Sequence, residues 1–237
     1  MRTFLVTLTA LLTVTFTNAQ TADEIVAKNT DALGGKEKLS QVSSIHSESS
    51  MEVMGNESSS KTTVLNGKGY KNETDFNGQQ IVQVVTDKGG WAINPFGGSA
   101  TATALPDDQF KMSEDQVYVT GPLFDYAAHG GKVELSGQEK VGDVNAYKLK
   151  YTNKDSAEST IYVDPTTWLV IQTVKKGEAM GQPINVTTSY SDYRKTDAGI
   201  TMPFAINIDM QQFALNVKVK NIEVNKAVDP TVFEMPK

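Results

Sequence analysis

One stretch of the sequence decides the fold: residues 146–174, which read AYKLKYTNKDSAESTIYVDPTTWLVIQTV. Its first part, YKLKY, alternates apolar with basic side chains, a period of two that predicts a strand with one solvent-exposed face. The turn-forming residues NKDS and DPTT separate this strand from two further apolar runs, IYV and WLVI. Because short turns join neighbouring antiparallel strands, the stretch predicts a three-stranded meander whose last run, WLVI, is covered on both faces.

The same period of two continues on both sides of this meander. Apolar and polar residues alternate through residues 45–53 and again, most regularly, through residues 200–210. Asn66-Gly67 and Asn77-Gly78 predict hairpin turns, because both central residues of a type I′ turn need a positive φ. The sequence therefore predicts a mainly β chain of antiparallel strands, with a smaller helical part (α+β).

Three irregularities mark this strand pattern. The apolar positions after residue 213 change from odd to even numbers near Lys220, which predicts a β-bulge. Pro203 cannot donate a backbone hydrogen bond, so its strand should be an edge strand or contain a bulge there. Residues 99–107 are small and polar, and we expect them to form a loop.

Two segments predict helices. Thr21 and Glu24 form a capping box at the start of an N-terminal helix, which Gly34-Gly35 ends. In the middle of the chain, Asp107 or Asp108 can cap a helix that reaches about residue 117, and a second short helix should follow from Gly121. A helical insertion between two sheet segments is expected to act as a plug or lid.

The first nineteen residues resemble a secretory signal peptide. Arg2 precedes an apolar and threonine-rich run, and the small residues of TNA at 17–19 predict cleavage after Ala19. A membrane anchor is the weaker interpretation, because the run is shorter than the ~20 residues of a spanning helix. We therefore expect residues 20–237 to form one exported, soluble periplasmic domain without stable membrane insertion. The lack of cysteine excludes disulfides and a lipid-anchored precursor.

Charge and motif content disfavour several functional classes. The chain has 22 Lys and Arg against 28 Asp and Glu, a net charge of −6, and no basic stripe, so nucleic acid is not an expected partner. His46 and His129 are the only histidines and lie far apart in the sequence. G-x-S-x-G, H-E-x-x-H and Walker sequences are absent. We expect a protein that is not an enzyme and has no catalytic residue, cofactor or metal site.

Large apolar side chains point instead to a binding cavity. They occur in the aromatic loop WAINPFGG at 91–98, among the methionines of the predicted strands, and in the helical insertion. Ordinary core packing is the alternative interpretation for each group. The residues predicted to line a hydrophobic ligand cavity are Met51, Val53, Trp91, Ile93, Phe96, Phe110, Leu123, Phe124, Met202, Phe204 and Ile206. Trp91 is expected at the mouth of that cavity.

Several blocks, in this order and spacing, resemble a known family. They are ADEIVAK (22–28) with LGGKEKL (33–39), GWAINPF (90–96), GPLFDY (121–126), AYKLK (146–150) with YVDP (162–165), and YSDY (190–193). Together they resemble the outer-membrane lipoprotein-sorting proteins of Bacteroidetes-type bacteria, within the LolA/LolB-like superfamily. The resemblance implies a single LolA-like domain, in which an incomplete antiparallel β-barrel or curved sheet covers an N-terminal helix and a short helical lid.

The resemblance also implies a function. It favours a carrier or binding protein for the acyl chains of lipids or lipoproteins, with a role in lipoprotein sorting to the outer membrane. One alternative is an envelope sensor or scaffold that binds a protein partner. A second, a hydrolase, would need a nucleophile or a carboxylate pair that the sequence does not display.

Overall fold

A computed structural model of the chain describes residues 20–53, 55–179, 182–211 and 213–236. The expected signal peptide, residues 1–19, lies outside the described residues. The strands are β1 (Ser44–Val53), β2 (Asn56–Leu65), β3 (Gly69–Phe76), β4 (Gln79–Thr86), β5 (Gly90–Asn94), β6 (Ser99–Ala104), β7 (Lys132–Val141), β8 (Val144–Thr152), β9 (Glu158–Val163), β10 (Val170–Ala179), β11 (Gln182–Lys195), β12 (Thr201–Asp209) and β13 (Ala214–Val224). The helices are α1 (Ala22–Ala32), α2 (Lys36–Ser40) and α3 (Asp107–Ser113), with 3₁₀ turns η1 (Pro95–Gly97), η2 (Glu114–Val117) and η3 (Pro230–Phe233).

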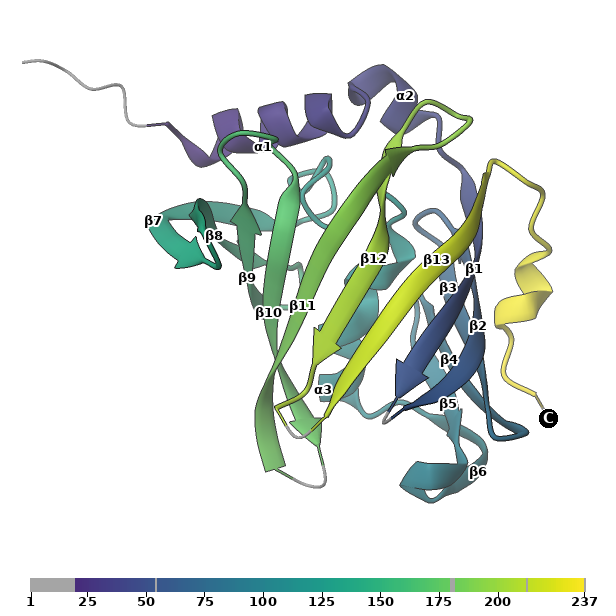
Figure 1. Ribbon diagram of the computed structural model, residues 1–237. Helices are drawn as coiled ribbons and strands as arrows, with labels where there is room; N and C mark the ends of the chain where they lie inside the picture. The colour runs from purple at the N-terminus through teal and green to yellow at the C-terminus, as the bar shows by residue number, and fades with distance from the viewer. Residues whose placement is uncertain (1–19, 54, 180–181, 212, 237) are drawn as a thin grey trace, which may run out of the picture.

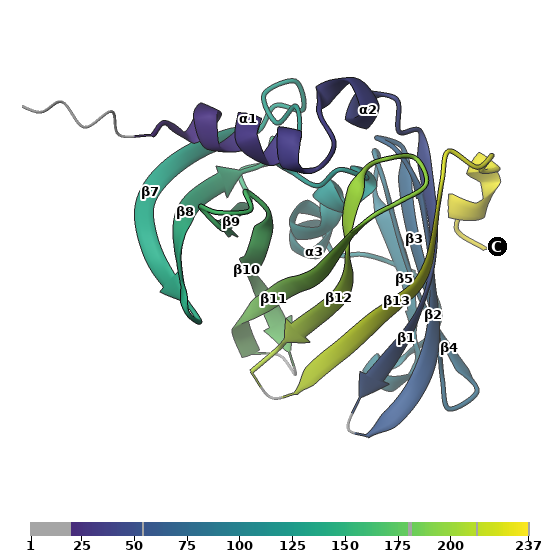
Figure 2. The same ribbon diagram turned by 45° about the horizontal axis from the view of Figure 1, so that its top comes forward.

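These strands form one antiparallel sheet in the order β6-β5-β4-β3-β2-β1-β13-β12-β11-β10-β9-β8-β7 (Figure 1). β6 and β7 are its two edges, so the curved sheet does not close into a barrel. Figure 2 shows the sheet curling around α3, with α1 and α2 across one open end and η3 on the outer side. The predicted fold class is confirmed. None of the described helices has the length and apolarity needed to cross a membrane.

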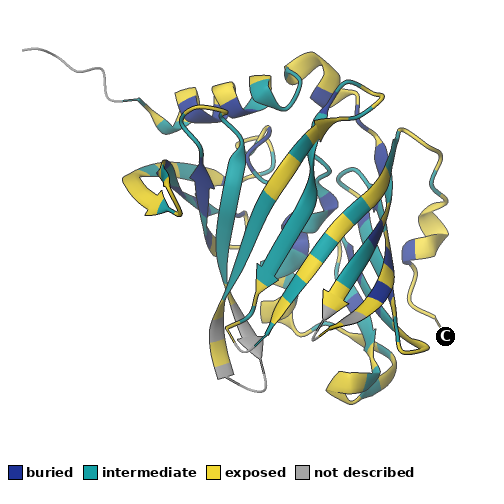
Figure 3. Ribbon diagram, in the orientation of Figure 1, coloured by how far each residue is buried: buried dark blue, intermediate teal, exposed yellow. Residues whose placement is uncertain are grey.

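The predicted meander is confirmed as β8, β9 and β10. Leu149 and Ile161 are buried in one cluster with Ile25 of α1, so the meander and the N-terminal helix share a core. The buried side of α1 faces the sheet (Figure 3). The start of the last strand is corrected: Trp168 has a φ of 60° and belongs to the turn, where its N–H donates to the Asp164 carbonyl at 2.8 Å.

The capping box at the start of α1 is confirmed. The Glu24 N–H donates to Thr21 Oγ1 at 3.2 Å, and the Thr21 N–H donates to the Glu24 carboxylate at 3.0 Å. Gly34 has a φ of +129°, and a Cβ there would lie 2.9 Å from the Gly199 carbonyl. Only glycine fits this close approach, so the helix ends where the sequence predicts.

One predicted strand irregularity is confirmed, and the other, an edge strand or bulge at Pro203, is wrong. The register between β1 and β13 shifts between Glu48 and Ser49, which leaves Lys220 as the extra residue of the predicted bulge. Pro203 lies in β12, an interior strand, yet the pairing of β12 with β13 begins only at Ala205. At Pro203 the strand therefore has one unpaired side, which accommodates the missing donor without a bulge in the register with β11.

Two expectations for the middle of the chain are wrong. Residues 99–104 form β6 and not a loop, because their alternating Thr and Ala side chains can pair beside β5. Residues 121–130 form successive turns and not a second helix. Gly121, Asp125 and Gly130 have φ values of 75°, 50° and 76°, which an α-helix does not contain.

Candidate functional site

An apolar cavity of about 210 Å³ lies between the two N-terminal helices and the sheet. Its walls come from α1, α2, the segment 119–123, and strands β9 to β12. The lining residues are Asn29, Leu33, Leu39, Val119, Thr120, Gly121, Pro122, Leu123, Ile161, Val170, Thr173, Tyr190, Tyr193, Ile200, Thr201, Met202 and Pro203. Most residues of this set have apolar side chains, so the cavity suits an apolar ligand.

The two tyrosine hydroxyls of the cavity wall have partners within the protein. The Tyr193 hydroxyl donates to the Val170 carbonyl at 2.6 Å, and the hydroxyl oxygens of Tyr190 and Thr173 lie 3.3 Å apart. Burial raises the pKa of both tyrosines, so they remain neutral phenols. The wall of this cavity therefore offers no ionised group to a ligand.

Helix α1 covers this cavity and is held in place by a buried amide. Asn29 is 2% exposed, and its Nδ2 donates to the Trp168 carbonyl at 2.7 Å. Lys28 Nζ lies 4.1 Å from the centre of the Trp168 ring, which adds a cation–π contact. At the far end of the helix, the Thr201 N–H donates to the Leu33 carbonyl at 2.8 Å. These contacts join α1 to the turn before β10 and to the start of β12.

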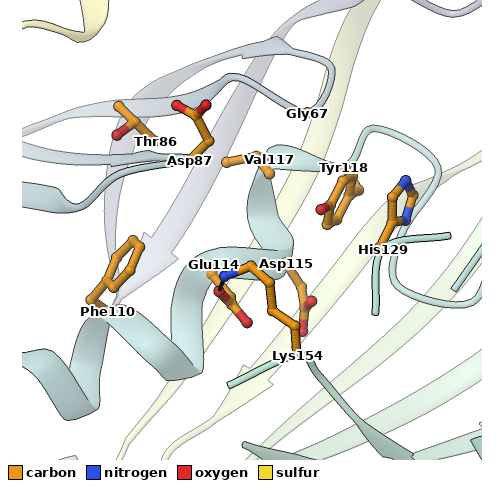
Figure 4. Close-up of a pocket in the computed structure, with 10 residues that line it drawn as sticks. All are labelled: Gly67, Thr86, Asp87, Phe110, Glu114, Asp115, Val117, Tyr118, His129 and Lys154. Atoms are coloured by element: carbon orange, nitrogen blue, oxygen red, sulfur yellow. Dashed lines mark hydrogen bonds and ion pairs between the residues drawn. The ribbon is translucent and has the colours of Figure 1, made fainter. Parts of the chain in front are cut away.

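A second, smaller pocket of about 40 Å³ lies beside η2 (Figure 4). Glu114 and Asp115 are buried there; Glu114 pairs with Lys154, and Asp115 accepts a 2.8 Å hydrogen bond from the Tyr151 hydroxyl. Asp115 also lies 3.9 Å from Lys175 Nζ. Burial raises the pKa of Glu114 against the opposing effect of the Lys154 charge. This pocket has room for about one or two waters and is too small for an acyl chain. We therefore assign the cluster of Glu114, Asp115, Tyr151 and Lys154 to anchoring η2 on the sheet.

The two histidines do not come together. His129 lines the small pocket and stacks on Tyr118, with ring centres 3.9 Å apart. Burial lowers its pKa, because the charged imidazolium is disfavoured there. His46 lies on β1, where Nδ1 is 3.2 Å from Thr63 Oγ1. In the described part of the chain, no group of three or more His, Cys, Asp or Glu residues is placed to hold a metal ion.

The structure separates the predicted cavity residues. Leu123 and Met202 line the large cavity, and Phe110 lines the small pocket. Phe124 is buried beside α2, and Ile93 packs on a cluster at the outer side of the sheet.

The remaining predicted residues lie on other parts of the sheet. Trp91 is buried, and its Nε1 donates to the Phe233 carbonyl of η3 at 2.9 Å. Phe96 is 57% exposed. The centre of the Phe204 ring lies 4.8 Å from Cζ of the Arg194 guanidinium. Met51 and Ile206 are half-buried on β1 and β12, and Val53 ends β1.

Several cavity residues were missed from the sequence. They include Leu33 and Leu39 near the N-terminus and Tyr190 and Tyr193 on β11. These four lie within the blocks LGGKEKL and YSDY, so the family resemblance contains a signal for them that the size and hydrophobicity of side chains do not give.

Comparisons with known proteins show which solved structures share this fold. No protein-family model matches the chain, and no curated protein does. Solved structures do match: a LolA-superfamily protein from Nitrosomonas europaea has a TM-score of 0.59 at 11% identity over 91% of this chain and 98% of that chain. The chain has a LolA-like fold.

Two further structures show the same LolA-like fold. A DUF1329-family protein from Desulfovibrio piger has a TM-score of 0.57 at 14% identity, covering 90% of this chain and 97% of that one. A domain from Vibrio parahaemolyticus described as an outer membrane lipoprotein-sorting protein has a TM-score of 0.56 at 11% identity, with the same two coverages of 90% and 97%. At these identities the likeness establishes the shared fold, in agreement with the resemblance found in the sequence.

Proposed function

We propose that this protein is a periplasmic, non-enzymatic carrier that holds the acyl chain of a lipid or lipoprotein, as a Bacteroidetes-type lipoprotein-sorting protein would. The observation that supports the proposal is the apolar cavity of about 210 Å³ under α1. Its fold is shared with a protein described as lipoprotein-sorting. Each methylene removed from water contributes about 0.8 kcal/mol, so a chain in this cavity gains affinity without any polar contact.

The size of the cavity sets how binding proceeds. An engineered apolar cavity of about 150 Å³ accepts benzene in another protein, so about 210 Å³ accepts only a short apolar segment. A longer acyl chain requires α1 or the segment 119–123 to move away from the sheet. The carrier is therefore a two-state protein, in which the ligand favours the open arrangement.

Filling the cavity tests the proposal. Met202 lines the cavity and Phe204, two residues further along β12, does not. We expect Met202→Trp to weaken the binding of a dansyl-labelled fatty acid at least tenfold, because the indole occupies ligand space. Phe204→Trp is the matched control; it keeps an aromatic ring under Arg194 and should bind like the original chain. Val119→Phe fills the same cavity from the segment 119–123 and should behave like Met202→Trp.

The measurement is a fluorescence titration on residues 20–237, with circular dichroism melting to confirm that each variant is folded. Folded cavity-filling variants with unchanged affinity would remove the cavity from the binding mechanism. Absence of binding by the original chain, at concentrations where the probe is monomeric, would contradict the carrier function itself.

A further inference from the structure

The turn between β2 and β3 does more than reverse the chain. The sequence predicts type I′ turns both at Asn66-Gly67 and at Asn77-Gly78. Asn77 and Gly78 have positive φ, as such a turn requires, whereas at the first site only Gly67 does, with a φ of 69°. Asn66 therefore lacks the backbone conformation for which this pattern favours asparagine, and its side chain is used elsewhere.

The Asn66 amide makes hydrogen bonds to two segments that lie far apart in the sequence. Its Nδ2 donates to the Val42 carbonyl at 3.1 Å, and its Oδ1 accepts from the Val119 N–H at 3.2 Å. The first partner is an acceptor and the second a donor, so the two ends of one amide serve both at once. Asn66 thus joins the residues just after α2 to the segment 119–123.

The backbone of the same turn adds two further hydrogen bonds. The Asn66 N–H donates to the Ser43 carbonyl, and the Gly67 N–H donates to the Val117 carbonyl, both at 2.9 Å. In the described part of the chain, two hydrogen bonds join residues 117–123 to distant residues, and both end on this turn. Most of this segment forms turns and has no strand partner, so these bonds are its polar attachment to the sheet.

Both of the parts that Asn66 joins border the large cavity. Leu39 of α2 and Val119 line it directly. Val42 and Phe124 are buried in one cluster with Leu39, and Val119 packs against that cluster. Asn66 is not a lining residue itself, yet its amide fixes how two walls of the cavity lie relative to each other.

We propose that Asn66 is a positioning residue that sets the length of acyl chain that the cavity accepts. The proposal rests on the carrier function proposed above and adds a specificity to it. While the amide holds the segment 119–123, the cavity keeps its volume of about 210 Å³, and the end of a longer chain stays in water. When the amide is removed, the segment can move away from α2, and further methylenes can enter.

A series of saturated fatty acids of increasing length measures this limit. Each methylene that enters the cavity should raise the affinity about fourfold, the ratio that corresponds to about 0.8 kcal/mol. For the wild-type chain we expect the affinity to stop rising once the cavity is full. In Asn66→Ala the rise should continue for two or more further carbons, so the longer acids should bind at least about tenfold more tightly than they bind the wild type. The shorter acids should bind both proteins alike.

The assay is displacement of a dansyl-labelled fatty acid from residues 20–237, at concentrations where each acid is monomeric. Asn77→Ala is the matched control, because it removes the asparagine of the other Asn-Gly turn. A purely structural role of Asn66 would lower the stability of both variants and leave the chain-length limit unchanged. Asn66→Ser is a second test variant, since its shorter side chain cannot reach both partners and should shift the limit in the same direction as Asn66→Ala.

Hydrogen exchange gives a readout that needs no ligand. The Val119 N–H should exchange at least about tenfold faster in Asn66→Ala than in the wild type, because its acceptor is gone. Asn66→Asp retains an acceptor oxygen and should retain this protection.

Two results would overturn the proposal in different ways. A wild-type chain that binds none of the acids would contradict the carrier function, and this specificity with it. Binding by the wild type, with the same chain-length limit in folded Asn66→Ala and Asn66→Ser, would overturn the role of Asn66 alone. Unchanged exchange of the Val119 N–H in Asn66→Ala would likewise show that the amide does not hold the segment.

Discussion

Replacing Asn29 with aspartate should release α1 from the sheet with almost no change in shape. Asn29 is 2% exposed, and its Nδ2 donates the 2.7 Å hydrogen bond to the Trp168 carbonyl. An ionised aspartate has no proton to donate, so a carboxylate oxygen would face the carbonyl oxygen. Leaving a buried acceptor without its partner costs about 1–3 kcal/mol, and more when a charge is buried.

This loss can be measured in two ways. Urea unfolding should show the free energy of unfolding reduced by at least about 1–3 kcal/mol. If α1 opens before the ligand enters, the same energy raises the open population, and the loading rate of a dansyl-labelled fatty acid should rise about 5- to 150-fold. A carboxyl group buried beside a carbonyl has a pKa raised above the ordinary aspartate value of about 3.9. The defect should therefore shrink as pH falls from that raised pKa toward the ordinary value, because the protonated group donates again.

Ala27→Asp is the matched control, because Ala27 is an exposed residue of α1 and receives the same charge. It should change the free energy of unfolding by no more than about 0.5 kcal/mol. An Asn29→Asp protein with unchanged stability and unchanged loading rate would show that the Asn29 hydrogen bond does not hold α1 closed. A loss of stability without faster loading would show that the ligand enters by another route, past the segment 119–123.

Three further predictions concern other parts of the molecule. Because burial lowers the pKa of His129 from its ordinary value of about 6.5, the unfolded chain gains its proton first, and stability should decrease as pH falls through that value. His129→Phe should remove that part of the slope in urea unfolding. Phe233→Ala should cost about 3–5 kcal/mol and shift tryptophan emission to the red, whereas exposed Val232→Ala should cost little. Tyr151→Phe removes the hydrogen-bond donor to buried Asp115 and should lower the free energy of unfolding by about 1–3 kcal/mol in the same assay. A decrease of less than about 0.5 kcal/mol, which is typical of surface substitutions, would contradict the role of this cluster in anchoring η2.

Local sequence was sufficient for the features that depend on near neighbours. The meander of residues 146–174, the capping box at Thr21 and the hairpin at Asn77-Gly78 each use contacts within a few positions. Asn77 and Gly78 both have positive φ, as a type I′ turn requires. The bulge at Lys220 was also visible, because a one-residue insertion exchanges the faces of all later side chains.

Local sequence misled where composition suggested the wrong structure. The small residues of SATATA favoured a loop, yet they pair with β5, the strand of buried Trp91, and form the edge of the sheet. Residues 121–130 had the composition of a helix, but tertiary contacts hold them in turns that include the positive φ of Asp125. In both segments the surroundings outweighed a weak intrinsic preference.

The sequence by itself determined that this is a mainly β chain, where its turns and caps lie, and that large apolar side chains are abundant. Only the tertiary structure decided which of those side chains border an empty volume. Trp91 is removed from the cavity by a hydrogen bond to Phe233, 142 positions later, whereas Tyr190 and Leu39 are brought into its wall. The physical reason is that burial stabilises an apolar side chain whether it lies in a packed core or in a cavity wall. Hydrophobicity in the sequence therefore does not distinguish these two positions. The way α1 crosses the curved sheet decides which side chains border the cavity.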